Sequence, residues 1–391
     1  MEEGILHAIQ GYMYPNEVEL QWSILIVLYP FTTGLVAGAF ILASLERVFN
    51  VAAVKPTYRL ALLSALAFLL VSPLPLQLHL GHPERSIEMY LTPHTSSAMA
   101  MFGFIYLWYL MAVLVLEIWL DYRKDMVLMA RSETGWKKTL YRILTLGVDN
   151  ISEESLRIDD KLGRFITIVG IPSALLLHGY VGFIFGSVKA NPWWSTPVMP
   201  IVFLFSAIVS GIALVLLMYM LICFLKGIQI DMPCVDTIAR YLMYAFLVDF
   251  SLEMLDLIHR IYEADESFKS LDFMVHTRLY TSSLVQIVFG TIIPIAMLAF
   301  VQLVKLSDAA RKGIYTLAGF LTLMGIFAMR WNVVIGGQLF SKSFLGYTTY
   351  KMAFATKEGL LPAILLMILP FVILWGLVKL LPPFDEEKAA V

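Results

Sequence analysis

The chain has 391 residues, of which 59% are hydrophobic and only 15% are charged. A typical soluble domain has about 45–50% apolar and about 25% charged residues, so this composition excludes a soluble enzyme and a disordered chain. The net charge of −2 provides no basic face for nucleic acid. Two cysteines are too few for a disulfide scaffold or for an iron–sulfur cluster, which needs about four ligands. Most of the surface of the folded protein must therefore face the lipid bilayer rather than water.

Nine segments are long and apolar enough to form membrane-spanning helices of about 20 residues. They are residues 21–45, 58–78, 96–120, 163–187, 197–225, 237–260, 279–304, 313–337 and 359–381. Residues 1–20 are acidic and lack the basic region and cleavage site of a signal peptide, so the first span should remain as an anchor. We predict an all-α, polytopic helix bundle with about nine spans, in the range of eight to ten, forming one membrane domain of residues 1–391.

The connections between the spans are short, except for residues 121–162, which are rich in charged side chains. Within this loop residues 136–148 are amphipathic and could lie on the membrane surface. When this loop is placed inside, the inner segments carry about 18 lysines and arginines against about 8 outside. The positive-inside rule therefore predicts that residues 1–20 are outside and that the C-terminus and the loop 121–162 are cytoplasmic.

Small residues indicate where helices approach one another. Gly34–Gly38 and Gly182–Gly186 have the GxxxG spacing that allows close contact between membrane helices. Because this spacing is common in apolar segments, it is a weak signal by itself.

The sixth predicted span contains an unusual file of charged residues. Asp249, Glu253, Asp256 and Arg260 follow one another at spacings of four, three and four residues, which places them on one helical stripe. His259 lies at the same end, off the stripe. A charged group inside a membrane span costs about 2.5–3.5 kcal/mol on insertion scales, so such residues are candidates for function. The stripe could form a proton path or the wall of a polar cavity, or it could serve as a set of structural salt bridges.

The fourth predicted span contains His178 and Tyr180, both nearer its outer end. A neutral histidine and a tyrosine are suitable hydrogen-bond partners for the oxygens of a quinone. A histidine bonded to a neighbouring core group is an equally good interpretation of His178 from the sequence.

The eighth predicted span places Arg330 and Asn332 in its outer half. Arg330 could neutralise the acidic stripe as a structural partner, or it could position an anionic intermediate. Gly336 and Gly337 would allow the helix to end or unwind beside a cavity.

The polar groups of these three helices are expected at one depth in the bilayer. Asn16 and Glu17 enter the first span from the same side. The outer loop HLGHPER could cover the site, and its polar members are His79, His82, Glu84 and Arg85. Because His178 is the only histidine deep inside a predicted span, bis-histidine ligation of haem is disfavoured. Cys223 and Cys234 form no CxxC pattern, so no metal site is expected.

Five segments resemble the NrfD/polysulfide-reductase membrane-subunit (PsrC-like) family, and the similarity covers nearly the whole chain. They are YPFTTGLVAGAF (29–40), LGHPER (80–85), HGYVGF (178–183), NPWWSTPVMPIVFLFSAIVSGIAL (191–214) and RWNVVIGGQ (330–338). Within this family the chain is most similar to DsrP, the quinone-interacting subunit of the DsrMKJOP complex of sulfate reducers.

The resemblance implies a multi-pass subunit of the prokaryotic cytoplasmic membrane that holds no redox cofactor of its own. It implies exchange of electrons between menaquinone and a ferredoxin-like iron–sulfur subunit on the outer face. Other membrane and cytochrome subunits of a complex in sulfur metabolism are further implied partners. In the family a tyrosine and an asparagine bind the quinone, and these match Tyr180 and, with less certain alignment, Asn16.

We therefore expect a quinone site formed by Tyr180, His178 and Asn16, with Arg330 and Asn332 close by. Protons would travel along Asp249, Glu253 and Asp256, with Arg260 and His259 at the outer end. Two other classes fit parts of the pattern: a proton-coupled secondary transporter and a structural membrane anchor. Transporters commonly show inverted repeats and broken helices, and the sequence shows neither clearly.

Overall fold

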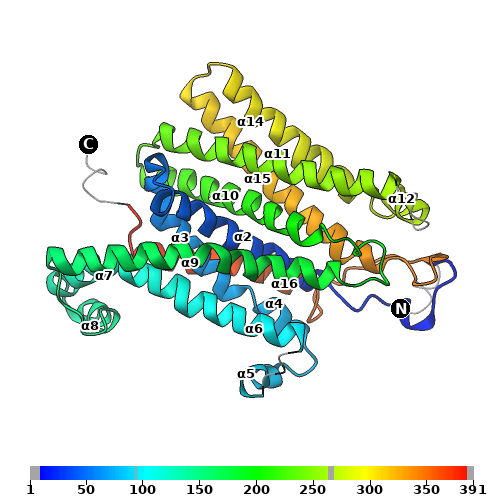
Figure 1. The fold of residues 1–391 in the computed structure, drawn as a ribbon, viewed down its shortest axis with the longest axis horizontal. Coiled ribbons are helices and arrows are strands. Elements are labelled where there is room, and N and C mark those ends of the chain that lie inside the picture. The colour runs from blue at the N-terminus through cyan, green and yellow to red at the C-terminus, as the bar shows by residue number, and fades with distance from the viewer. Residues whose placement is uncertain (1–8, 93, 95, 263–267, 385–391) are drawn as a thin grey trace.

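The computed structural model describes residues 9–92, 94, 96–262 and 268–384. Their architecture is a bundle of long helices (Figure 1), and one small antiparallel sheet joins β1 (Gln10–Gly11) to β2 (Gly346–Tyr347). The all-α prediction is confirmed. Residues 1–8 of the predicted outer segment and residues 385–391 at the predicted cytoplasmic terminus lie outside the described residues. The sides of the membrane on which the termini lie stay a prediction.

Eight helical segments of the described chain are long and apolar enough to cross a membrane. Four of them are single helices: α2 (Ile24–Arg47), α9 (Glu153–Gly186), α10 (Met199–Lys226) and α16 (Leu360–Leu380). The segment Ala52–His79 consists of η2 (Ala52–Val54), α3 (Lys55–Val71) and α4 (Leu74–His79). The segment Asp308–Gln338 consists of α15 (Asp308–Val334) and η6 (Gly336–Gln338).

The other two segments each contain a stretch of π-helix. The segment Ala100–Ser132 comprises most of α6 (Ala98–Trp108), the π-helix η4 (Tyr109–Val115) and α7 (Leu116–Ser132). The segment Tyr280–Leu303 comprises α13 (Tyr280–Leu284), the π-helix η5 (Val285–Ile292) and α14 (Ile293–Leu303). A π-helical turn widens the helix and is frequent at functional sites.

The sixth predicted span corresponds to α11 (Met232–Tyr262), a helix of 31 residues that packs against α10 and α14. At a rise of 1.5 Å per residue it is about 46 Å long, which exceeds the hydrocarbon thickness of a bilayer. It is not among the eight apolar segments because its sequence carries four acids and two arginines. The helix thus has the length of a span but not the composition of one.

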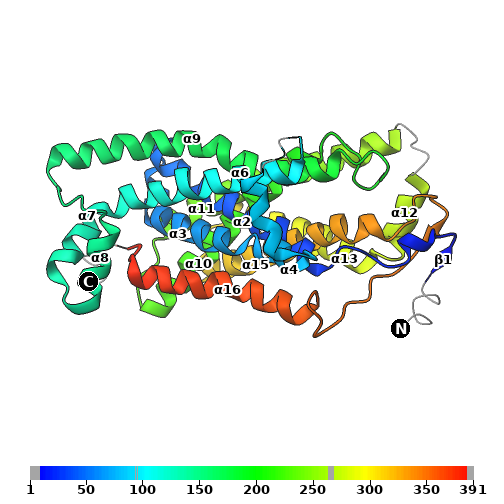
Figure 2. The same cartoon turned by 90° about the horizontal axis from the view of Figure 1, so that it is seen from below.

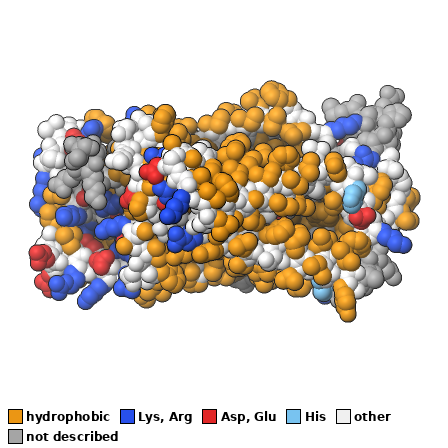
Figure 3. Space-filling model, turned by 90° about the horizontal axis from the view of Figure 1, so that it is seen from above, with side chains coloured by type: hydrophobic (Ala, Val, Ile, Leu, Met, Phe, Trp, Pro, Cys, Tyr) orange, Lys and Arg blue, Asp and Glu red, His pale blue; other side chains and the backbone are white. Residues whose placement is uncertain are grey.

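Short elements cover both ends of the bundle, as Figures 1 and 2 show. The end near the start of the chain carries η1 (Pro15–Glu17) and α12 (Phe268–His276), whereas η3 (Pro83–Ile87) and α5 (Glu88–Leu91) lie beside the bundle, next to the start of α6. The opposite end carries α8 (Gly135–Leu144), which overlaps the predicted amphipathic segment 136–148. Figure 3 shows many lysines and arginines at this α8 end and a broad hydrophobic belt between the ends.

The centre of the bundle is α10, which packs against α2, α9, α11 and α15. Gly38 on α2 meets Gly211 on α10 so closely that a Cβ on either glycine would collide with backbone atoms of the other helix. Gly182 and Gly186 of α9 lie in the same way against the start of α10. Both predicted GxxxG pairs are therefore confirmed as close helix contacts.

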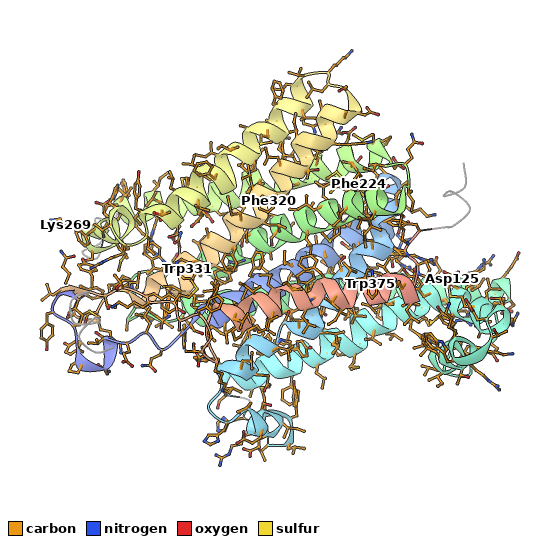
Figure 4. All side chains as sticks on the ribbon, turned by 180° about the vertical axis from the view of Figure 1, so that it is seen from behind. Asp125, Phe224, Lys269, Phe320, Trp331 and Trp375 are labelled. Atoms are coloured by element: carbon orange, nitrogen blue, oxygen red, sulfur yellow. The ribbon has the colours of Figure 1, made fainter. Side chains whose placement is uncertain are left out.

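Large apolar side chains cover the outside of the bundle. Phe224, Phe320 and Trp375 have exposed fractions of 79%, 60% and 63%, and Figure 4 shows them on three different helices. The same view places Lys269 and Asp125 at opposite ends. An apolar belt between two polar ends is what a membrane requires of a protein that crosses it.

Candidate functional site

His178 on α9 and Arg330 on α15 meet in the buried centre of the bundle. Nη2 of Arg330 lies 3.0 Å from Nε2 of His178, and Nδ1 of His178 lies 3.1 Å from the Thr33 hydroxyl on α2. Because a guanidinium can only donate hydrogen bonds, Nε2 of His178 must accept. The imidazole is therefore neutral, with its proton on Nδ1 directed at Thr33. Both ring nitrogens of His178 are thus occupied by protein groups.

Arg330 makes its other contacts on α10 and on its own helix. Nη2 also lies 2.7 Å from the Ser206 hydroxyl, and the guanidinium carbon is 4.0 Å from the centre of the Phe203 ring. Nη1 lies 3.1 Å from the sulfur of Met329. Among the described residues no carboxylate comes within 4.0 Å of Arg330. Arg330 is therefore a fully buried cation held by neutral acceptors and an aromatic face.

The acidic stripe on α11 starts in the core and ends at an ion pair. Asp249 is buried, and its Oδ1 has no hydrogen-bond partner among the described residues. Asp256 pairs with Arg260 at 3.1 Å and accepts a hydrogen bond from Thr196. Arg260 also donates to the carbonyl of Pro192 at 2.6 Å. The Arg260 end of the stripe is therefore neutralised, whereas Asp249 is not; His259 is exposed at this end.

Glu253 joins the stripe to Asn332 through a residue that the sequence did not single out. Nε2 of Gln286 lies 3.3 Å from Oε2 of Glu253, and Oε1 of Gln286 accepts from Nδ2 of Asn332 at 2.8 Å. Ser282 donates to the other end of the Asn332 amide. Gln286 lies in the π-helix η5. An amide within an otherwise apolar span was the signal that could have identified it.

Tyr180 faces a different side of α9 from His178, because residues two apart on a helix point in nearly opposite directions. Its ring is half-buried and stacks on Phe102 at 6.1 Å, and Phe102 also contacts Tyr29 and Tyr106. These four rings, from α2, α6 and α9, form an aromatic cluster. The hydroxyl oxygen of Tyr180 is enclosed and has no hydrogen-bond partner among the described residues. The structure therefore separates Tyr180 from the His178–Arg330 pair.

Asn16 lies in η1 at the end of the bundle near the start of the chain, and its side chain is exposed. The next residue, Glu17, accepts hydrogen bonds from the Ser341 hydroxyl and from the backbone N–H of Lys342. Farther along, Trp22 exchanges backbone–side-chain hydrogen bonds with Gln338. The segment that carries Asn16 is thus tied to the chain that follows α15.

The loop that contains residues 79–85 is held to the segment before α16. His79 pairs with Glu358 at 2.9 Å, and Lys357 donates to the carbonyl of Leu80 at 2.9 Å. His82 and Glu84 form a pair at 3.0 Å with both side chains about two-thirds exposed. Together with exposed Arg85, they present a charged surface at this end of the molecule.

Two cavities lie away from the predicted site residues. The larger, of about 390 Å³, is lined by Gln10, Lys269, Phe273 and Tyr347 among others. The second, of about 210 Å³, lies at the α8 end. In the described part of the chain, no group of three or more His, Cys, Asp or Glu side chains could hold a metal ion.

A family model described as polysulphide reductase, NrfD, matches residues 14–342 of the chain. The matched range includes the aromatic cluster, the His178–Arg330 pair and the acidic stripe.

Three curated proteins are similar to the chain. A selenate reductase subunit of Mesobacillus selenatarsenatis is 29% identical over 94% of this chain and 87% of the relative. A putative dimethyl sulfoxide reductase membrane subunit of Halobacterium salinarum is 28% identical over 51% of this chain and 43% of the relative. Protein NrfD of Escherichia coli is 27% identical over 51% of this chain and 59% of the relative. The first similarity thus extends along nearly the whole chain, and the other two along about half of it.

Proposed function

This chain belongs to the polysulphide reductase, NrfD, family, and we propose that it is the quinone-interacting membrane subunit of a respiratory reductase complex. In this proposal it serves the exchange of electrons between menaquinone in the bilayer and an iron–sulfur subunit docked on the outer face. The names of two relatives, a selenate reductase subunit and a dimethyl sulfoxide reductase membrane subunit, support a place in a reductase complex. Membership of the DsrP-like subgroup stays a prediction.

The enclosed hydroxyl of Tyr180 is the observation that carries the quinone site. A buried hydroxyl without a partner costs free energy, and a ligand oxygen at hydrogen-bonding distance would remove that cost. The aromatic cluster around it offers ring faces on which a flat quinone head group can stack. The Tyr180 ring is only half-buried, so part of the aromatic cluster is exposed at the surface of the bundle. When bound, the quinone supplies the two-electron, two-proton chemistry.

In this proposal His178 holds Arg330 rather than the quinone, because its two ring nitrogens already bond to Thr33 and Arg330. Arg330 in turn supplies a fixed positive charge near Asp249 and Glu253, the two acids whose charges act on it. Asn16 is the second proposed quinone ligand, on a segment tied to Ser341 and Lys342.

The proposed proton route follows α11. Asp249 would hold a proton in the core and pass it along the stripe to Glu253 and Asp256, while the amide chain of Gln286 and Asn332 holds the Glu253 carboxyl in place. The ion pair of Asp256 and Arg260 stands at the outer end of this route. We place the α8 end, with its lysines and arginines, in the cytoplasm and the loop of His79 to Arg85 on the partner side.

Binding of a menaquinone analogue to the purified complex tests the proposal. Tyr180→Phe should weaken binding at least tenfold without lowering thermal stability, because its hydroxyl makes no hydrogen bond within the described chain. Tyr106→Phe is the matched control: it changes a cluster ring whose hydroxyl donates to the Leu69 carbonyl at 3.0 Å. It should leave binding intact. Equal affinity of wild type and Tyr180→Phe would refute the site.

A further inference from the structure

A second buried carboxyl lies toward the α8 end of the bundle, far along the helices from the aromatic cluster. Glu117 is the second residue of α7, and its side chain has an exposed fraction of 0%. It forms hydrogen bonds with Tyr58 of α3 and Thr167 of α9, and Arg47 at the end of α2 donates a hydrogen bond to Tyr58. The proposed quinone function makes no use of this group.

Only one of the two carboxylate oxygens of Glu117 has hydrogen-bond partners among the described residues. Oε1 accepts from the Tyr58 hydroxyl at 3.0 Å and lies 2.7 Å from the Thr167 hydroxyl. Oε2 has no hydrogen-bond partner among the described residues, and neither has the buried hydroxyl of Tyr109 on η4. An ionised carboxylate with one bare oxygen is costly in an apolar interior, and a proton on that oxygen removes the charge.

Arg47 connects the buried carboxyl to the polar end of the bundle. Its Nη1 donates to the Tyr58 hydroxyl at 2.9 Å and to Asp121 at 3.1 Å. Its Nη2 lies 3.4 Å from Asp160, whose side chain has an exposed fraction of 80%. Hydrogen bonds therefore run without a break from solvent at Asp160 through Arg47 and Tyr58 to Glu117.

A cavity of about 210 Å³ opens where this connection reaches the surface. Its charged lining residues are Arg47, Arg59, Lys124, Asp121, Asp125, Asp159 and Asp160. Water can occupy a cavity lined by charges of both signs, because a buried water molecule needs several polar partners. Water in it can supply and take up protons beside Arg47 and Asp121, which line the cavity.

We propose that Glu117 is a proton-binding site that exchanges one proton with the solvent at the α8 end. In uptake, one proton passes from a hydronium ion in the cavity to Oε2 of Glu117, and no electron moves; the hydrogen bonds through Arg47 and Tyr58 hold Oε1 in place and do not carry the proton. Arg47 keeps its charge, because a guanidinium does not give up its proton in proteins. It therefore balances the carboxylate when the proton leaves.

The groups around Glu117 leave its charge only partly balanced. The titratable or charged groups that act on it are Arg47 on α2, Tyr58 on α3, Tyr109 on η4 and Asp121 on α7. Helix α9 contributes the neutral Thr167 hydroxyl next to Glu117 and, farther out, Asp160, which pairs with Arg47. Arg47 is shared with Asp121 and Asp160, and Arg59 pairs with Asp121 and Asp125, so two cations serve four carboxylates when Glu117 is included. This site is independent of the quinone proposal, and its test needs no quinone.

Infrared difference spectroscopy of the full chain, purified with its partner subunits, tests the inference. A pH change should produce a carboxyl C=O band that shifts in heavy water, and Glu117→Gln should abolish it. Asp125→Asn is the control, because Asp125 lines the same cavity but pairs with Arg59. It should retain the band. A wild-type protein without such a band, or a band unchanged in Glu117→Gln, overturns the proposal.

A second variant guards against loss of folding in Glu117→Gln. Thr167→Val removes a hydroxyl 2.7 Å from Oε1 of Glu117 while keeping the size of the side chain. The band should then move to higher frequency, because its carbonyl has lost a hydrogen-bond donor. An unmoved band would show that it arises elsewhere and would contradict the proposal.

Discussion

The Arg330 guanidinium donates its hydrogen bond to the imidazole of His178 across 3.0 Å, and no described carboxylate lies within 4.0 Å of it. A cation buried at this depth needs acceptors, and it finds them in neutral groups on α9 and α10. Arg330 therefore places a positive charge near Asp249 but forms no ion pair with its carboxyl group. In the proposed proton route, this separation would allow the acid to change its protonation state while the cation stays in place.

The first prediction concerns His178 as the support of Arg330. His178→Ala should destabilise the protein by about 1–3 kcal/mol, because a buried guanidinium N–H and the Thr33 hydroxyl lose their partner. His178→Gln should retain much of the stability, since its amide oxygen can accept from Arg330 and its amide nitrogen can donate to Thr33. Thermal unfolding in detergent measures both. Equal losses for the two variants would show that packing of the ring, not hydrogen bonding, is what matters.

The second prediction concerns the contact between α2 and α10. Gly38→Ala should destabilise the bundle by about 1–3 kcal/mol, because the added methyl group meets backbone atoms of Ala207 and Gly211. Gly376→Ala on α16 is the matched control, since nothing lies within 4 Å of its added Cβ. It should be neutral or stabilising by up to about 1 kcal/mol. Unfolding in mixed detergent micelles provides the comparison, and a neutral Gly38→Ala would contradict the close contact.

The sequence predicted the spans well where apolar residues alone decide them. The third predicted span ends at residue 120, but the helix continues to Ser132. It does so because Arg123 and Asp125 are engaged by Asp159 and Arg59 on neighbouring helices beyond the apolar belt. Hydropathy identifies the residues that can lie in the bilayer, but it does not detect ion pairs that stabilise a helix beyond the bilayer. It therefore could not predict where the helices end at the α8 end of the bundle.

The same limit applies to the candidate site. The charges of Asp249 and Arg330 were visible in the sequence, which predicted Asp249 near the middle of the membrane and Arg330 in the outer half of its helix. Their partners depend on how each helix is rotated about its axis, which contacts such as that of Gly34 with the His178 ring determine. For this reason the sequence suggested an Arg330–carboxylate pair, and the described contacts show an Arg330–His178 pair instead.

The third prediction concerns Gln286, which only the structure revealed. Gln286→Leu and Asn332→Leu should each destabilise the protein, and the double variant should lose less than the sum. The coupling energy should be about 0.6 kcal/mol, in the range measured for hydrogen bonds between membrane helices. A cycle of Gln286→Leu with Ser206→Ala is the control and should be additive, because Ser206 bonds to Arg330 instead. A Gln286–Asn332 cycle that is also additive would count against the amide chain.

The fourth prediction concerns Arg260, which joins α11 to the chain before α10. Its guanidinium bonds to Asp256 at 3.1 Å and to the Pro192 carbonyl at 2.6 Å, so Arg260→Met should release this connection from α11. Hydrogen exchange in residues 187–198 should then become faster, because local opening no longer breaks these bonds. Lys189→Met changes an exposed cation of the same connection and should leave the exchange unchanged.

The ion pair also determines what Arg260→Met does to Asp256. The acid keeps its hydrogen bond from Thr196 but loses its only described cation partner, and at 21% exposure it is too buried for water to replace that charge fully. The additional variant Asp256→Asn, placed on Arg260→Met, should therefore restore part of the lost stability. If it fails to do so, the pair is a surface contact of little weight, and the connection before α10 is held by other groups.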